Sequence, residues 1–205
     1  MNIKDNYNKV LELYTDKSSD NNFLSRPFTQ EGSIYATNRF AAIRIKGTSE
    51  DYDEIGKPVM SDLFESDGTE KRFSFEDILK KANEAPMIAE YKESEKKKCT
   101  ECNGGGQVEW EYKDWTKMLD CPKCDGEGYE EGKLEPTGNM IKDPSFLVRI
   151  GNRNFKLDNI VKLLTTMEFL ESDYVILKSR ESVYENVVFA INEDVSVAMM
   201  PIYKD

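Results

Sequence analysis

The stretch NFKLDNIVKLL, residues Asn154–Leu164, decides the main fold. Its apolar residues recur at helical spacing, at positions 157, 160, 161 and 164, which predicts an amphipathic helix. Three short apolar segments follow and are expected to be strands: residues 174–177, 187–191 and 195–200. Polar residues 180–182 and 192–194 provide turns between them, and 146–150 is expected to be a strand before the helix.

The N-terminal part has a similar order of elements. Apolar residues at positions 7, 10, 11 and 14 predict a first helix. Residues 33–46 are expected to be extended after a hairpin turn at Glu31-Gly32, and Phe23-Leu24 is expected to be extended as well. The acidic residues 49–68 have no clear period and are expected to form a loop or irregular edge.

A further helix is expected from Phe75 to Ala82. Ser74 is a plausible N-cap with Asp77 three residues later, and Pro86 closes the segment. These elements together predict an α+β domain made of two similar halves, each with a helix and strands.

All four cysteines of the chain lie in two copies of the motif C-x-x-C-x-G-x-G. They are residues 99–106 and 121–128, with ligand candidates Cys99, Cys102, Cys121 and Cys124. Two residues between thiolates allow one tight turn to present both sulfurs to a metal, and two such turns supply four tetrahedral ligands. We therefore expect one structural Zn²⁺, with no coordination position left open for catalysis.

Three other uses of the cysteines explain the motif less well. A dithiol redox centre needs only one C-x-x-C, structural disulfides are typical of exported proteins, and an iron–sulfur cluster does not account for the paired glycines. The repeated motif resembles the zinc-binding region of the DnaJ (Hsp40) chaperones, over residues 99–128 only. That resemblance implies a zinc-bound β-hairpin; it does not imply a co-chaperone, because a chain without histidine has no His-Pro-Asp signature.

The residues between the two motifs predict a hairpin. Val108, Trp110 and Tyr112 alternate with glutamates, and Lys113-Asp114 can form the turn before a return strand at 115–120. The interpretation favoured by the sequence is that Trp110 and Trp115 pack beside the metal as filler for a small core. The alternative is an exposed aromatic platform of Trp110, Tyr112 and Trp115 that binds a peptide or bases.

Polar runs at 93–98 and 130–133 flank this segment, so it is expected to be an insertion. The predicted organisation is residues 1–94 as the first half of the main domain, 95–132 as the zinc hairpin and 133–205 as the second half. The lysines of the insertion are a candidate polyanion-binding patch, although interleaved acidic residues make ordinary solvation the simpler account. These lysines are Lys96, Lys97, Lys98, Lys113, Lys117 and Lys123.

A second resemblance covers about half of the chain. The helix at 154–164 with the three strands ending at Met200-Pro201, together with Ile34–Ala41, is similar to one domain of the bacterial DNA polymerase sliding clamp. It implies a single clamp-like domain with the zinc hairpin inserted. True clamps carry two or three such domains per chain and close into a ring, so a homo-oligomer is a possible state here.

Composition narrows the function. The net charge of −11 gives no support for non-specific binding to DNA, which would require a locally basic face, and the absence of histidine counts against acid–base catalysis. We expect a non-enzymatic, cytoplasmic accessory protein without a membrane segment, docking DNA or a replication-type protein partner. A chaperone-like adaptor that binds peptides through the zinc hairpin is the alternative function.

Overall fold

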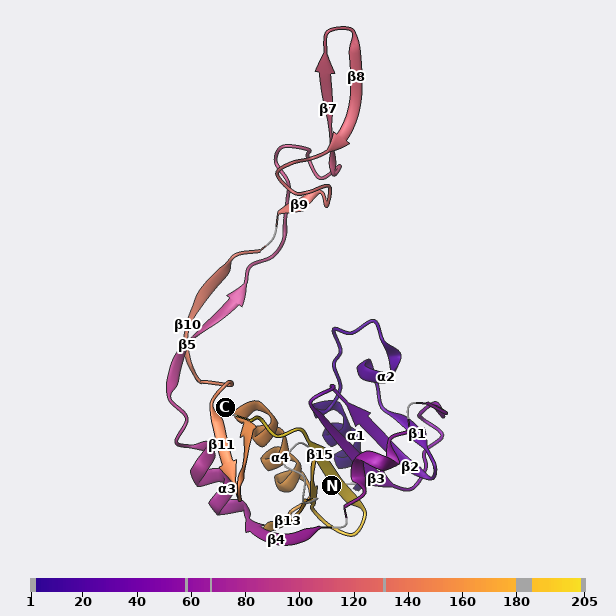
Figure 1. Cartoon of the computed structure of the whole chain (residues 1–205), viewed down its shortest axis with the longest axis vertical. Coiled ribbons are helices and arrows are strands. Elements are labelled where there is room, and N and C mark those ends of the chain that lie inside the picture. The colour runs from indigo at the N-terminus through magenta and orange to yellow at the C-terminus, as the bar shows by residue number, and fades with distance from the viewer. Residues whose placement is uncertain (1–2, 58, 67, 131, 180–185, 204–205) are drawn as a thin grey trace. The chain divides into compact units, whose positions relative to one another are not determined.

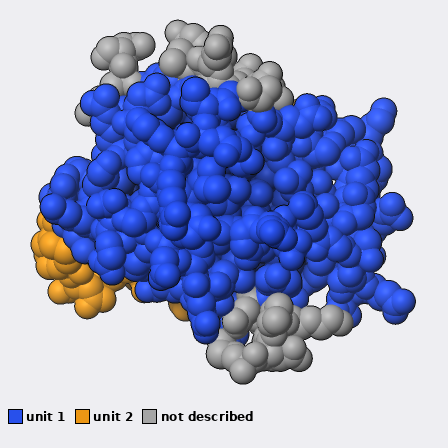
Figure 2. Space-filling view, turned by 90° about the horizontal axis from the view of Figure 1, so that it is seen from below, with its two compact units in different colours: residues 1–86, 143–205 blue, residues 87–142 orange. Residues whose placement is uncertain are grey.

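The computed structural model describes residues 3–57, 59–66, 68–130, 132–179 and 186–203 (Figure 1). The chain divides into two compact units, coloured in Figure 2. Residues 1–86 and 143–205 form unit 1, and residues 87–142 form unit 2. Within the described ranges, no helix is long and apolar enough to cross a membrane.

Unit 1 is built on a seven-stranded antiparallel sheet with the order β1-β2-β3-β15-β14-β13-β4. The strands are β1 Phe28–Gln30, β2 Ser33–Thr37, β3 Ala41–Lys46, β4 Thr69–Ser74, β13 Tyr174–Ser179, β14 Val187–Ala190 and β15 Val195–Met199. Helix α1, Ile3–Leu13, precedes β1–β3, and helix α4, Leu157–Phe169, precedes β13–β15. The two three-strand groups meet where β3 pairs with β15, with Ile43 opposite Val197. A helix followed by three strands therefore occurs twice, an order that the sequence predicted explicitly only for the second half.

The remaining elements of unit 1 are short. They are α2 Asn22–Ser25, a 3₁₀ helix at Ser61–Phe64, α3 Phe75–Ala82 and the hairpin of β11 Leu147–Ile150 with β12 Arg153–Lys156. The expected N-cap of α3 is confirmed, since the Ser74 hydroxyl accepts a hydrogen bond from the Asp77 N–H at 3.1 Å. The expectation for Phe23-Leu24 was wrong: both lie in α2, where the Asn21 side chain accepts a hydrogen bond from the Phe23 N–H. The turn predicted at 180–182 lies outside the described residues.

The main core of unit 1 lies between the sheet and its helices. Leu11 of α1, Ile160 of α4 and Ile43 of β3 belong to it and are fully buried. The Tyr14 hydroxyl hydrogen-bonds Thr166 at 3.1 Å, which joins the segment after α1 to α4. The helical and strand periods therefore direct the apolar residues of both halves into one core.

The other face of the sheet carries a second, smaller core. Tyr35 of β2 stacks on Phe28 at 5.8 Å between ring centroids and is also packed by Phe64. Phe64 and Met60 come from the stretch 49–68, which is largely irregular as expected. Through these two residues the stretch packs on one face of the sheet, which its acidic composition did not predict.

The described residues of unit 2 form three antiparallel strand pairs. These are β5 Met87–Glu93 with β10 Leu134–Lys142, β6 Lys97–Lys98 with β9 Tyr129–Glu130, and β7 Gln107–Tyr112 with β8 Trp115–Asp120. The β7–β8 hairpin confirms the predicted strands and their turn, at which Lys113 has a φ of 55°. Unit 2 also includes the β5–β10 pair, both of whose strands lie outside the predicted insertion at 95–132.

Candidate metal centre and docking surfaces

The four cysteines converge on one point in unit 2. Their sulfur atoms all lie within 4.8 Å of one another, and all four are free thiols. The Cys99 and Cys121 sulfurs are 3.7 Å apart, as are those of Cys102 and Cys124. Cys99, Cys121 and Cys124 are buried, while Cys102 is partly exposed. The sequence therefore brings the predicted ligands together as one cluster with metal-binding spacing.

The backbones of the two C-x-x-C-x-G-x-G knuckles hold each other reciprocally. The Cys99 N–H donates to the Gly128 carbonyl at 2.9 Å, and the Cys121 N–H donates to the Gly106 carbonyl at 2.8 Å. Gly106 has a φ of +74°, and a Cβ built on it would lie 2.3 Å from the Gly126 carbonyl oxygen. The last glycine of the first motif is therefore required both for its positive φ and for close approach of the second knuckle.

The thiols differ in their acidity. Burial raises the pKa of Cys102, but hydrogen bonds from the backbone N–H groups of Gly106 and Gly104 outweigh it and bring this pKa down to about 7. Burial raises the pKa of Cys124 to about 12, despite a hydrogen bond from the Gly128 N–H. Without a cation, four adjacent thiols cannot all ionise, so the full thiolate set requires positive charge among them.

A polar bridge closes the outside of the cluster. The Lys123 ammonium contacts the Glu130 carboxylate at 2.9 Å and donates to the Thr100 hydroxyl at 2.6 Å. Lys123 belongs to the second knuckle and Thr100 to the first, so the bridge links the two. The hydrogen bond that Lys123 donates to Glu130 is the main reason that the pKa of Glu130 is lowered.

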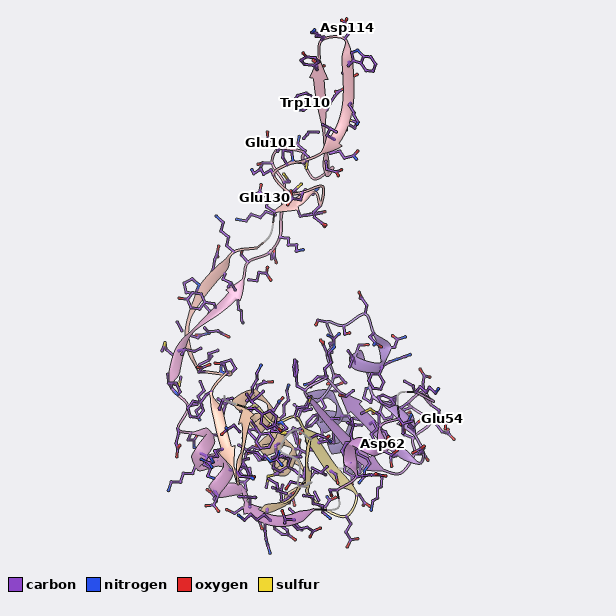
Figure 3. All side chains as sticks on the ribbon, in the orientation of Figure 1. Glu54, Asp62, Glu101, Trp110, Asp114 and Glu130 are labelled. Atoms are coloured by element: carbon purple, nitrogen blue, oxygen red, sulfur yellow. The ribbon has the colours of Figure 1, made fainter. Side chains whose placement is uncertain are left out.

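The interpretation of the tryptophans as metal-side filler was wrong. Trp110 is 59% exposed and Trp115 79% exposed. Both lie on the β7–β8 hairpin, where Figure 3 labels Trp110. Val108 packs against the cysteine cluster instead. Alternation along the strand predicted an apolar face but did not reveal that its aromatic side chains are left exposed by the described residues of the unit.

The six candidate lysines lie in different parts of unit 2, some in strands and some in loops. Lys97 and Lys98 form β6, next to Lys96, and Lys97 is paired in register with Glu130. Lys123 contacts the same Glu130. Lys113 and Lys117 belong to the β7–β8 hairpin. The structure therefore does not gather the six residues in one strand pair, and acidic partners accompany those near the knuckles.

Sequence reasoning missed a pocket in unit 1. It has a volume of about 240 Å³ and lies where the β2–β3 turn meets the end of β15. Its lining includes Arg39, Phe40, Leu63, Met199 and Met200. The Asn38 side chain accepts hydrogen bonds from the N–H groups of Phe40 and Ala41, which shapes the turn, and the Met200 N–H donates to the Phe40 carbonyl at 3.1 Å. The sequence pointed to this region only through the second resemblance, which included both Ile34–Ala41 and Met200-Pro201.

No protein-family model matches the chain, and no curated protein matches it either. Solved structures of similar fold include the DNA polymerase sliding clamp of Bacillus subtilis, with 9% identity and a TM-score of 0.50 over 99% of this chain and 63% of that one. They also include the Helicobacter pylori beta clamp bound to a DNA ligase peptide, with 11% identity and a TM-score of 0.51 over 97% of this chain and 63% of that one. The chain thus spans less than two thirds of these proteins. The likeness shows the fold alone: a mixed α/β chain with a fold similar to the sliding clamp.

Proposed function

We propose that this chain is a zinc-binding, non-catalytic accessory protein that docks a peptide segment of a partner protein on its clamp-like unit. The observation that carries the docking proposal is the apolar pocket at Phe40 and Met200. The observation that carries the metal proposal is the convergence of four thiols.

The thiol geometry fits one tetrahedral ion. An ion with metal–sulfur bonds of about 2.3 Å holds its four sulfurs about 3.8 Å apart, close to the two 3.7 Å separations. Four thiolates fill the tetrahedron, so Zn²⁺ would stabilise the knuckles and leave no position for substrate or water. This closed ligand set, with the absence of histidine from the sequence, supports a non-catalytic protein.

Zinc affinity is expected to depend on pH, because the ion must displace protons from the thiols. With the pKa of Cys124 near 12, its proton must be displaced throughout the physiological range, whereas Cys102, with a pKa near 7, becomes protonated only on acidification. The apparent affinity should fall as pH is lowered, by about tenfold per pH unit for each proton displaced, and more steeply below pH 7 than above it. Competition with a chromophoric chelator between pH 6 and 8 measures this; a constant affinity would contradict thiolate ligation.

The pocket suits a short apolar peptide with some acidic character. Phe40 is 57% exposed and Met200 is 55% exposed, so both offer apolar surface at the pocket. Arg39 lines it, and the Lys156 ammonium lies 5.5 Å from the Phe40 ring centroid. Apolar anchors in a preformed pocket supply most of the affinity of such complexes, and nearby cations select acidic neighbours. A clamp-fold protein that binds a DNA ligase peptide provides the precedent for this class of ligand.

Phe40→Ala is expected to weaken peptide binding by about 5- to 150-fold, since removal of an exposed aromatic anchor costs about 1–3 kcal/mol. The probe is a fluorescein-labelled copy of the DNA ligase peptide, and the measurement is fluorescence anisotropy with the full chain. Val161→Ala is the matched control, because Val161 is 47% exposed on α4 and does not line the pocket. Equal binding by both variants, or no binding by the parent chain, would contradict the docking proposal.

A further inference from the structure

The β7–β8 hairpin has two chemically different faces. In an antiparallel pair, directly opposed residues share a face and alternate residues change face. The register places Tyr112 opposite Trp115, Trp110 opposite Lys117 and Val108 opposite Leu119. These six residues form one face, here called the aromatic face. Trp110, Tyr112 and Trp115 are 59%, 62% and 79% exposed, so this face is open to solvent in its distal half.

Charge is segregated between the two faces. Glu109, Glu111 and Asp120 alternate with the aromatic face and therefore lie on the back of the hairpin. The aromatic face carries Lys117 in its middle, and the Lys113 ammonium at the turn lies 5.4 Å from the Tyr112 ring centroid. Two cations therefore accompany three exposed rings, while the carboxylates of the strands are on the opposite side.

This arrangement discriminates between possible occupants. A second copy of the hairpin or an apolar peptide would bury the Lys117 ammonium against apolar groups, which is costly without an anionic partner. A single-stranded polynucleotide meets both features, because its bases stack on aromatic rings and its phosphates pair with ammonium groups. Trp110 and Tyr112 are about 6.7 Å apart along the strand, which leaves room for separate bases.

We propose that the aromatic face binds single-stranded DNA through stacking on Trp110, Tyr112 and Trp115, with phosphate contacts from Lys117 and Lys113. The strand carboxylates, which could accept a hydrogen bond from a ribose 2′-hydroxyl, lie on the back face, and this favours DNA as the single strand bound. This site is in unit 2 and does not depend on the peptide pocket of unit 1.

The experiment uses the fluorescence of the chain's two tryptophans, both of which lie on the aromatic face. Titration of the full chain, with its metal, against oligothymidylate of 12 nucleotides at low salt is expected to quench this fluorescence saturably. The salt dependence of log K should have a slope of about −1.4, for two phosphate contacts to a single strand. A duplex of the same length should bind at least about tenfold more weakly, because its bases are not free to stack.

Substitutions separate stacking from charge. Trp115→Ala should weaken binding by about 5- to 150-fold, with Trp110 still reporting, whereas Met118→Ala on the back face of the same strand should leave it unchanged. Lys117→Ala should halve the salt slope, and Lys92→Ala, which removes the same charge from β5, should not. Neither Trp115 nor Lys117 is buried, so both variants are expected to fold.

Four results would overturn the proposal. The first is unchanged tryptophan fluorescence at low salt, and the second is an equal loss of DNA affinity in Trp115→Ala and Met118→Ala. The third is an oligouridylate of 12 nucleotides that binds about tenfold more tightly than the DNA. The fourth is quenching by oligoglutamate as strong as that by oligothymidylate. The last would show that the face recognises negative charge on a peptide rather than bases. None of these results bears on the ligase-peptide assay, so failure of this site and failure of the pocket are distinguishable.

Discussion

Cys121→Ser is expected to abolish stoichiometric zinc binding. The Cys121 sulfur is fully buried and lies 3.7 Å from that of Cys99, so a serine oxygen in its place leaves three thiolates and an incomplete tetrahedron. Binding of a structural zinc ion is worth about 10–16 kcal/mol and is coupled to local folding, so residues 99–128 should lose their fixed structure. Native mass spectrometry measures the metal content, and hydrogen exchange of residues 99–128 reports the local folding.

The rest of the chain is expected to tolerate this loss. Unit 1 has its own core between sheet and helices, and every described residue of that core belongs to unit 1. Its thermal transition should therefore remain within a few degrees of the parent in Cys121→Ser and after treatment with a zinc chelator. Met118→Ser, an exposed position in the same unit, is the control and should keep one zinc ion per chain. A parent chain that contains no metal, or a Cys121→Ser variant that retains it at full affinity, would show that the cluster is not a zinc site.

Local spacing explains why the cluster of four cysteines was predictable. Both C-x-x-C-x-G-x-G motifs specify their own turns, and only the meeting of the two knuckles requires the chain between them. The β7–β8 strands were predictable for the same reason, because alternation and a two-residue turn are contained within 14 residues. The helices α1, α3 and α4 follow from 3.6-residue periods, which also select their buried faces.

Features that depend on distant partners were not predictable in the same way. Strand β5 pairs with β10 more than 40 residues later, and neither Met87–Glu93 nor Leu134–Lys142 has a clean alternation of its own. The pocket in unit 1 combines Phe40, Leu63 and Met200, whose only common property in the sequence is that they are apolar. The exposure of Trp110 and Trp115 was unpredictable for the same reason. A strand period identifies an apolar face, but it does not show whether another part of the chain packs on that face.

Gly106→Ala is expected to weaken zinc binding by far more than a surface glycine substitution does. The new Cβ would lie 2.3 Å from the Gly126 carbonyl oxygen, a backbone atom that cannot rotate away as a side chain would. Separation of the knuckles would also strain the hydrogen bond from the Cys121 N–H to the Gly106 carbonyl. Overpacking costs about 1–3 kcal/mol and a left-handed alanine about 1–2 kcal/mol more, so zinc affinity should fall by about 30- to several-thousand-fold.

Gly138→Ala is the matched control for this prediction. Gly138 has a φ of +84°, similar to the +74° of Gly106, but a Cβ there meets no atom within 4 Å. Gly138 lies in β10, outside the knuckles, so Gly138→Ala should leave zinc affinity unchanged. The difference between the two variants therefore reports the full cost of the alanine at the knuckle, its positive φ and its close contact together. Gly128→Ala should behave like Gly106→Ala, because its Cβ would lie 2.6 Å from the Gly104 carbonyl oxygen in the reciprocal position. Chelator competition measures all three affinities; if Gly106→Ala and Gly138→Ala bind zinc equally, the close backbone approach does not hold the metal centre together, and the two knuckles must form it independently of each other.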